Sequence, residues 1–468
     1  MYGLKRENPV ITIALIGSII SAGIYTLFAF NIFYLFDDFQ LLIEAKKYLF
    51  KSLFLPIGVH LRPIMRAHFL ILSHVSLYSY TISNLISLLL FFATVLSFYL
   101  IIKEIYNKKT ALLSSLFLII LSPYNEAVYW ISANGVLYNF LFLNLSLLFY
   151  LKNKKVYSIF FLLLSYFSYE TWLLIIPIVI FHKISKREKV KNIIFEPLLI
   201  SSSILILLQF LTNIFFHFSL TSYGTIKSIE ELPYRIMVYL LRAISPFYTP
   251  SYLIFVIVLI ISVLLAVFFI IKSRFDFKIS FPLILYFGTS FIFLLSAKIG
   301  SRFYFITSAG LSIIIAIILL KIINTKNKVI IPITYFLSFY LIFVSSLSLY
   351  IDGVDYLGIS KVYKNLIKEG EHNLKNVKEG EKIILEDRVD DKLLINYFLK
   401  SVIKKRKLIY YRENSIGGFI YLNDYVDFLL IKKDLVSKKT DCKNIDKIIV
   451  IGKKQNTFRK YCFIVKKL

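Results

Sequence analysis

The chain is short of two things, cysteine and charge, and each shortage excludes a class of protein. Two cysteines in 468 residues exclude a disulfide scaffold and leave no zinc-binding spacing. Charged residues make up 18% of the chain, against about 25% in a typical soluble domain. Combined with a hydrophobic share of 58%, this composition also excludes a disordered protein and a coiled coil.

Apolar and aromatic residues are abundant instead. The chain has 44 phenylalanines and 33 tyrosines, and its mean hydropathy is +0.72. A helix that crosses a bilayer needs about 20 mostly apolar residues, and stretches near that length recur, which indicates a polytopic α-helical membrane protein. We expect eleven spans, at residues 9–36, 80–102, 110–122, 134–151, 156–168, 171–182, 193–216, 250–271, 279–296, 303–320 and 329–351. The first is long and has no small-residue cleavage site, so we interpret it as a transmembrane helix rather than a signal peptide.

The net charge is +27, and within residues 1–351 the basic residues are denser in the loops expected on the cytoplasmic side. With the N-terminus in the cytoplasm, the inner loops carry 19 Lys and Arg in 43 residues, and the outer loops 10 in 98. This difference fits the positive-inside rule, so membrane topology explains the basic excess better than nucleic acid does. Seven acidic residues fall in the outer loops: Asp37, Asp38, Glu44, Glu126, Glu170, Glu230 and Glu231. We therefore expect any chemistry at the outer face.

The last part of the chain, residues 352–468, has no long apolar runs. Five segments have strand character and one, 391–405, has helical periodicity. The expected strands are 382–386, 407–411, 427–431, 447–451 and 461–465. The sequence thus predicts two domains, a membrane domain over 1–351 and a small extracytoplasmic α/β domain over 352–468. Cys442 and Cys462 lie in the second domain, either as a disulfide or as two thiols.

The first outer loop holds carboxylates and cations. Asp37 and Asp38 follow the first span, where a carboxylate pair can act as a general base or hold a divalent cation such as Mg or Mn. An acidic pair that simply faces water is the alternative. Arg62 and Arg66 lie one helical turn apart around Pro63, and guanidinium groups fork onto phosphate oxygens. An interfacial helix whose arginines meet lipid headgroups is equally compatible.

The other outer loops are short and carry charges that stand out from their surroundings. The loop "SPYNEAVYWISANGVLYN" (122–139) combines Glu126 with Trp130 and Asn134, as the lining of a sugar site does, whereas an interface belt would explain the aromatics alone. Glu170 lies between two apolar segments, where an ionisable group is costly. Lys298 and Arg302 oppose the inside-positive trend, which indicates an anionic ligand or two snorkelling cations.

Five elements together resemble a known family. "SPYNEAVYWISANGVLYN" resembles the HP-x-x-x-EAV-x-W-x-x-x-R-x-x-L segment of multi-pass GT-C fold glycosyltransferases, in particular the protein O-mannosyltransferases with tetratricopeptide repeats and their bacterial relatives. "SYETWLLIIP", "GSRFYFITSAG", "HLRPI" and "FDDF" resemble further segments of that family, in its order. Some positions depart from it: Asn125, Asn134, Tyr169 and Ser301 replace other polar, basic or acidic residues, and the tail holds no tetratricopeptide array.

The resemblance implies an enzyme that transfers a sugar, with inversion, from a polyprenyl-phosphate-linked donor to an acceptor hydroxyl at the outer face. Asp37 and Asp38 would be the catalytic carboxylates. The remaining expected roles divide into two groups. The donor phosphate would be held by Arg62, Arg66, Lys298 and Arg302. The sugar or acceptor pocket would be lined by His60, Glu126, Trp130, Asn134, Tyr169, Glu170 and Tyr304.

Two other classes of function remain open at this level. A transporter or flippase of lipid-linked saccharides would need charges inside the helix bundle and access from both sides. A non-catalytic envelope scaffold would use the basic tail to hold a polymer or a partner. In each case the expected partners are membrane lipids and a lipid-linked saccharide or an unknown acceptor, not nucleic acid.

Overall fold

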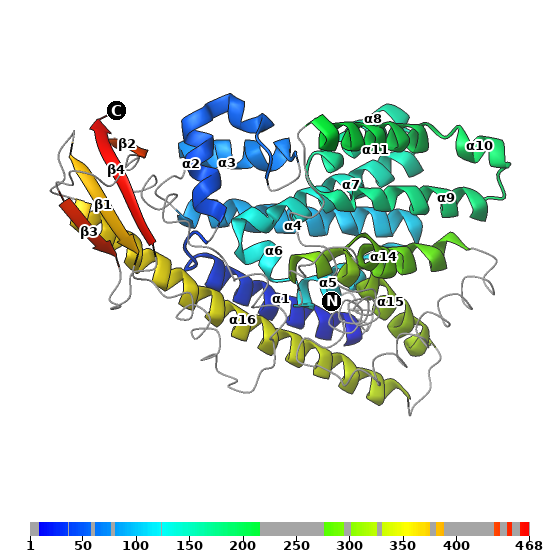
Figure 1. Ribbon diagram of the computed structural model, residues 1–468. Helices are drawn as coiled ribbons and strands as arrows, with labels where there is room; N and C mark the ends of the chain where they lie inside the picture. Colours follow the sequence, from blue (N-terminus) through cyan, green and yellow to red (C-terminus); the bar gives the residue numbers. More distant parts are fainter. Residues whose placement is uncertain are drawn as a thin grey trace, which may run out of the picture.

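The protein is built mainly of long apolar helices (Figure 1). The computed structural model describes residues 9–35, 37–57, 61–75, 80–122, 124–215, 276–293, 301–324, 330–374, 381–387, 435–439, 447–451 and 459–467. Within them the α-helices are α1 (Pro9–Ala29), α2 (Asp37–Tyr48), α3 (Pro63–Val75), α4 (Tyr80–Ile105), α5 (Lys108–Ile120), α6 (Glu126–Tyr129), α7 (Gly135–Leu151), α8 (Lys155–Tyr166), α9 (Ile175–Ser185), α10 (Val190–Ile194), α11 (Pro197–Phe215), α14 (Phe277–Phe293), α15 (Tyr304–Asn324) and α16 (Ile330–Leu374). Short 3₁₀ helices connect them: η1 (Leu49–Phe54), η2 (Ile131–Asn134), η3 (Glu170–Leu174) and η5 (Ser301–Phe303).

Five of the described helices are long and apolar enough to cross a membrane, and the protein is a multi-pass membrane protein. They are Pro9–Ala29, Tyr80–Ile105, Ile131–Leu151, Tyr304–Asn324 and Thr334–Gly358. Three shorter apolar helices, Lys155–Tyr166, Pro197–Thr212 and Phe277–Thr289, accompany them. The expected span at 250–271 lies outside the described residues, so the number eleven stays a prediction.

Aromatic rings and close helix contacts fill the centre of the bundle. Helix α1 packs between α5 and α16, and α15 packs between α5 and α14. The rings of Tyr25, Phe91 and Tyr124 are fully buried there. Gly310 of α15 faces the backbone of α14 so closely that a Cβ would come within 2.5 Å of the Tyr286 nitrogen. This contact explains why α15 carries glycine at that position, since any side chain would force the two helices apart.

A proline inside α14 is compensated from α4. Pro282 has no N–H group, so the carbonyl of Lys278, one turn earlier, loses its normal helical partner. The hydroxyl of Tyr106, just after the end of α4, donates a hydrogen bond to that same carbonyl. The contact joins the C-terminal end of α4 to the first turn of α14.

This compensation predicts a pair of linked stability effects. Tyr106→Phe should lower the free energy of unfolding by about 0.5–1.5 kcal/mol, the usual value of one hydrogen bond. In a Pro282→Ala background the new N–H serves the Lys278 carbonyl, so the same change should cost much less. Denaturant unfolding of the four proteins in detergent measures both numbers. An equal loss of stability on Tyr106→Phe with and without Pro282 would contradict the proposal that Tyr106 replaces the missing hydrogen bond.

The segment expected to be the first outer loop forms a compact unit of α2, η1 and α3. Arg66 of α3 is buried, and its guanidinium group donates to the carboxylate of Glu44 and to the carbonyl oxygens of Leu55 (3.1 Å) and Pro56 (2.6 Å). Leu49 begins η1 in the left-handed region, at φ 49°, which turns the chain sharply from α2 into η1. Arg66 therefore ties the three elements together.

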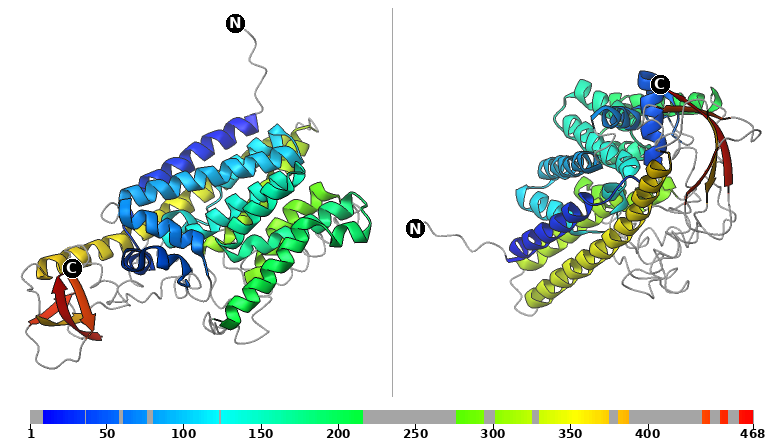
Figure 2. Two further views of the ribbon diagram at one scale, coloured as in Figure 1. Left: turned by 90° about the horizontal axis from the view of Figure 1, so that it is seen from above. Right: turned by 90° about the vertical axis from the view of Figure 1, so that its left-hand side faces the viewer.

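A small sheet lies at the C-terminal end of α16 (Figures 1 and 2). Its strand order is β2-β4-β1-β3, with β1 (Lys382–Asp387), β2 (Leu435–Lys439), β3 (Lys447–Ile451) and β4 (Arg459–Lys467). Strand β1 pairs parallel with β3 and antiparallel with β4, and β2 pairs antiparallel with β4. Strands β1, β3 and β4 lie where strands are expected. The other expected strands and the helix at 391–405 fall outside the described residues, so the α/β domain stays a prediction.

Helix α16 runs from the bundle to this sheet without a break (Figure 1). Its first part packs against α1, and its far part contacts β3. Between these ends, Ser360 accepts a hydrogen bond from the Phe33 N–H (2.5 Å), and Lys364 donates to the hydroxyl of Tyr80 (3.0 Å). The boundary expected at residue 351 thus falls inside a continuous helix.

Candidate functional site

A buried ion pair joins α6 to η5. Glu126 is the first residue of the single-turn helix α6 and is 1% exposed, whereas Arg302 is 23% exposed. One Glu126 oxygen accepts the Arg302 guanidinium (2.8 Å), and the other accepts the Arg302 backbone N–H (3.1 Å). The guanidinium also lies over the rings of Trp130 and Phe303, at 5.0 and 5.1 Å from their centres. Glu126 therefore fixes both the backbone and the side chain of Arg302.

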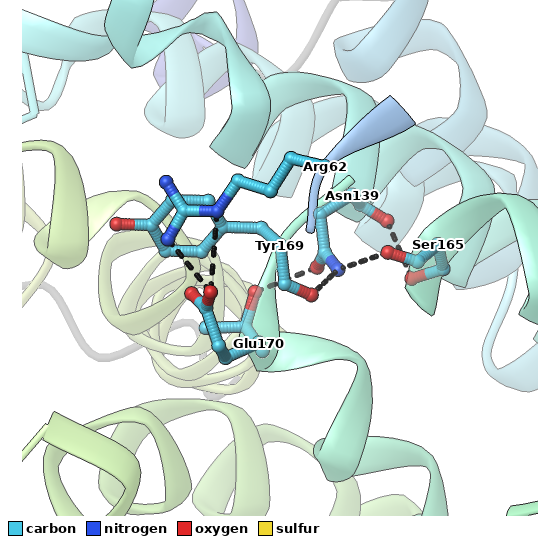
Figure 3. A network of polar contacts seen from close by, with 6 residues as sticks. Arg62, Asn139, Ser165, Tyr169 and Glu170 are labelled. Carbon is cyan, nitrogen blue, oxygen red and sulfur yellow. Dashed lines mark hydrogen bonds and ion pairs between the residues drawn. The ribbon is translucent and has the colours of Figure 1, made fainter. Parts of the chain in front are cut away.

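A second ion pair joins the start of α3 to η3 (Figure 3). Arg62 donates to one oxygen of Glu170 through Nη2 (2.6 Å) and Nε (3.2 Å). The two side chains are 12% and 23% exposed. The Arg62 guanidinium stacks on the ring of Tyr169, 4.1 Å from its centre. The carboxylate and the ring thus hold this cation from two sides.

A buried amide orders the turn that carries Glu170 (Figure 3). Asn139 of α7 donates to the carbonyl oxygens of Ser165 (2.9 Å) and Tyr169 (2.6 Å), and it accepts from the hydroxyl of Thr171 (2.6 Å). These contacts add to the backbone hydrogen bonds of the turn between α8 and η3, where the Ser165 carbonyl also accepts from the N–H groups of Ser168 (3.0 Å) and Tyr169 (3.2 Å). Asn139 therefore sets the positions of Tyr169 and Glu170.

The two ion pairs belong to one site. The ring of Tyr169, under Arg62, lies 6.1 Å from the ring of Phe303, which in turn lies against Arg302. Carboxylates, guanidinium groups and aromatic faces therefore form a continuous row from Glu170 to Glu126. Such a row is suited to an anionic group held by the cations and to a sugar ring stacked on an aromatic face.

The two aspartates of the first loop are placed differently from each other. Asp38 is buried, and its oxygens accept the Leu35 N–H (3.0 Å), the Ser132 N–H (2.8 Å) and the Ser132 hydroxyl (2.5 Å). It therefore anchors the start of α2 to η2, beside Trp130. Asp37 precedes it as the first residue of α2, and its side chain lies outside the described part of the structure.

Other expected site residues have positions of their own. Asn134 is buried and joins two elements, since its amide donates to the Ala127 carbonyl (2.9 Å) and accepts from Ser87 (2.6 Å). Tyr304 is fully buried at the start of α15. Arg66 is engaged in the loop unit described above. His60 and Lys298 lie outside the described residues.

Asp352 is a site residue that the sequence did not reveal. It belongs to α16, and its carboxylate accepts a hydrogen bond from the side chain of Asn125, the residue before Glu126. Ser348, one turn earlier, lies 3.5 Å from the same oxygen. An acidic residue at the end of an apolar span was the available signal. The expected domain boundary at 351 separated it from the span and concealed that signal.

A histidine of the first loop unit is buried in its neutral form. His68 of α3 contacts the Tyr138 hydroxyl of α7 through Nδ1 (2.9 Å). Burial lowers the pKa of His68 to about 4. Because the unfolded chain binds this proton near pH 6.5, the folded state gains stability from His68 above that pH and loses it as the pH falls toward 4.

This shift predicts an acid-dependent loss of stability. Between about pH 6.5 and pH 4 the protein should lose about 2–3 kcal/mol through His68. His68→Gln, which does not titrate, should flatten the change by that amount. Unfolding in detergent at pH 7.5 and pH 4, for both proteins, measures the difference. An identical drop in the variant would assign the pH dependence to other groups.

Comparison with known proteins gives structural likeness only. No protein-family model and no curated protein matches this chain. Among solved structures, the chain is similar to the archaeal oligosaccharyltransferase AglB from Archaeoglobus fulgidus in complex with an inhibitory peptide and a dolichol-phosphate, with 12% identity and a TM-score of 0.49 over 86% of this chain and 61% of that one. The apo form of the Archaeoglobus fulgidus oligosaccharyltransferase gives 12% identity and a TM-score of 0.45, with the same coverage. The form tethered to an acceptor peptide gives 11% and 0.45, over 84% and 59%.

The chain spans about three fifths of the length of these structures. At TM-scores below 0.5 the likeness carries no argument about activity, which has to come from the residues of this chain.

Proposed function

We propose that the protein is a GT-C type membrane glycosyltransferase that moves a sugar from a polyprenyl-phosphate-linked donor to an acceptor hydroxyl at the outer face of the membrane. The observation that carries the proposal is the row of two carboxylate-held arginines joined by aromatic rings, from Glu126 to Glu170. Ion pairs of this kind are costly to build near a membrane. Binding of a lipid-linked phosphate would account for two such ion pairs in one site.

The leaving group of the reaction explains the arginines. When the bond between the sugar and the lipid phosphate breaks, negative charge grows on the phosphate oxygens, and preorganised cations stabilise that charge. We assign this role to Arg62 and Arg302, because both are partly exposed while their carboxylate partners fix their directions. Arg66 is given the structural role of tying the first loop together.

The acceptor hydroxyl needs a base on the face of the sugar opposite the phosphate, which makes the transfer inverting. We assign the base to Asp37, because the neighbouring Asp38 uses both oxygens to hold backbone and side-chain donors. Trp130 and Tyr169, both buried, support the guanidinium groups of Arg302 and Arg62 with their rings. Asn134, Asp38 and Asn139 act as positioning residues behind this site.

A divalent metal fits the described residues poorly. No three His, Cys, Asp or Glu side chains of the described segments gather around one point. The oxygens of Asp38 already accept two N–H groups and one hydroxyl, which a metal ion would have to displace.

The test is consumption of a labelled donor. Purified protein in nanodiscs is incubated with a panel of radiolabelled polyprenyl-phosphate sugars and with acceptor peptides, lipids or glycans. Formation of a new glycosidic bond, lost in Glu126→Gln and in Arg62→Gln, is the expected result. Movement of intact donor across proteoliposome membranes, without a new bond, would instead identify a transporter.

A further inference from the structure

The first outer loop carries an exposed surface that the proposed reaction does not use. In a 3₁₀ helix, residues three apart share a face. In η1, Ser52 is buried, whereas Phe50, Lys51 and Phe54 are exposed and Leu53 is half-buried. Phe50 is 75% exposed and Phe54 is 68% exposed. Tyr48 and Leu49, at the turn into η1, are exposed as well.

The charge around this surface has one sign. Lys46, Lys47 and Lys51 flank the exposed rings, and residues 45–57 contain no acidic residue. The nearest carboxylate in sequence, Glu44, is paired with Arg66 behind the surface. Aromatic rings beside lysines on one face are the combination that settles at a bilayer surface, with rings at the acyl boundary and amines at the phosphates.

The supporting unit is rigid enough to present such a surface. Arg66 holds Glu44 and the carbonyl groups of Leu55 and Pro56, on both sides of η1. The left-handed turn at Leu49 sets the direction of η1. Arg62 and Arg66, the residues that the sequence offered for lipid headgroups, are both engaged in ion pairs. Lys47 of α2 and Lys51 of η1 are the exposed cations instead.

We propose that the exposed face of η1, centred on Phe50 and Phe54, docks on the outer surface of the membrane that the protein spans. Lys47 and Lys51 then favour anionic phospholipid headgroups at that surface. Each lysine near an anionic surface should strengthen this contact by about 1 kcal/mol, which is roughly fivefold in affinity. The inference does not depend on the proposed transfer reaction.

Depth-dependent quenching tests the docking in the full chain. In a Cys442→Ser, Cys462→Ser background, Phe50→Cys is labelled with a nitrobenzoxadiazole dye and placed in nanodiscs. Spin-labelled lipids at headgroup depth should quench the dye, and iodide in water should not. Adding about one third anionic phosphatidylglycerol should raise the lipid quenching at least about twofold. Labelling at Phe54→Cys gives the same measurement if the first variant folds poorly.

A matched pair of charge variants separates docking from general effects. Lys47→Gln with Lys51→Gln should remove the response to anionic lipid. Lys154→Gln with Lys155→Gln, exposed lysines at the start of α8, should keep it. Strong iodide quenching at residue 50 would overturn the proposal, because the face would then lie in water. Protection from both quenchers would also overturn it, since protein would then cover the face.

Discussion

Arg302→Gln is expected to abolish sugar transfer and to destabilise the protein by about 2–4 kcal/mol, the order found when one partner of a buried ion pair is removed. The cause is Glu126, which is 1% exposed and would lose its cation. The loss is below that of a fully buried pair because Arg302 itself reaches solvent. Thermal unfolding in detergent and the labelled-donor assay measure the two effects.

A double variant separates the two roles of this pair. Glu126→Gln with Arg302→Gln has no buried charge at this position, so it should recover most of the lost stability. Transfer should stay absent, because the cation at the phosphate is missing. Recovery of both stability and transfer would reduce the pair to a structural feature. Lys183→Gln, which breaks the ion pairs to Glu188 and Glu196 at the other end of the bundle, is the control and should leave transfer unchanged.

We expect the two aspartate variants to lose different properties: Asp37→Asn loses sugar transfer, and Asp38→Asn loses stability. Asp37→Asn should reduce transfer by about a hundredfold or more, the usual contribution of a general base, without changing stability. Asp38→Asn should cost about 1–3 kcal/mol of stability. Its new NH₂ group would face either the Leu35 N–H or the Ser132 donors, and a donor cannot accept from them.

The comparison of the two variants decides which aspartate acts. Transfer is measured per folded molecule, after unfolding curves have fixed the folded fraction at the assay temperature. Normal transfer by folded Asp38→Asn is consistent with its role as an anchor. Normal transfer by Asp37→Asn would remove the proposed base, and Glu170, the partly exposed carboxylate that is paired with Arg62, would become the residue to replace next.

The sequence located the charged residues of the site but not their partners. Glu126, Glu170 and Arg302 stood out because each is a charge where apolar or oppositely charged surroundings are the rule. The ion pairs themselves join residues 108 and 176 positions apart. Neither hydropathy nor spacing contains that information, because both describe the chain locally. The different roles of the adjacent Asp37 and Asp38 depend on the same kind of distant contact, with Ser132.

The apolar spans were predicted well where length and composition decide them, as in α1, α4 and α15. Hydropathy was less informative about where a helix ends. The expected last span stopped at residue 351, where the apolar run stops, but α16 continues to Leu374. Its later turns, residues 352–374, hold three lysines and three leucines, which are good helix formers, but also three glycines, which are poor ones. Helix propensity alone therefore does not explain why the helix continues.

The continuity of α16 has a consequence for the sheet. Each residue of an α-helix turns the chain by about 100° and advances it by 1.5 Å. The number of residues between Lys364, which is fixed at Tyr80, and the end of α16 therefore sets the direction in which the sheet faces as well as its distance. One inserted residue would swing the sheet by more than a quarter turn around the helix axis. An insertion between Lys364 and the end of α16 would therefore change the orientation of the sheet, unlike an insertion in a loop.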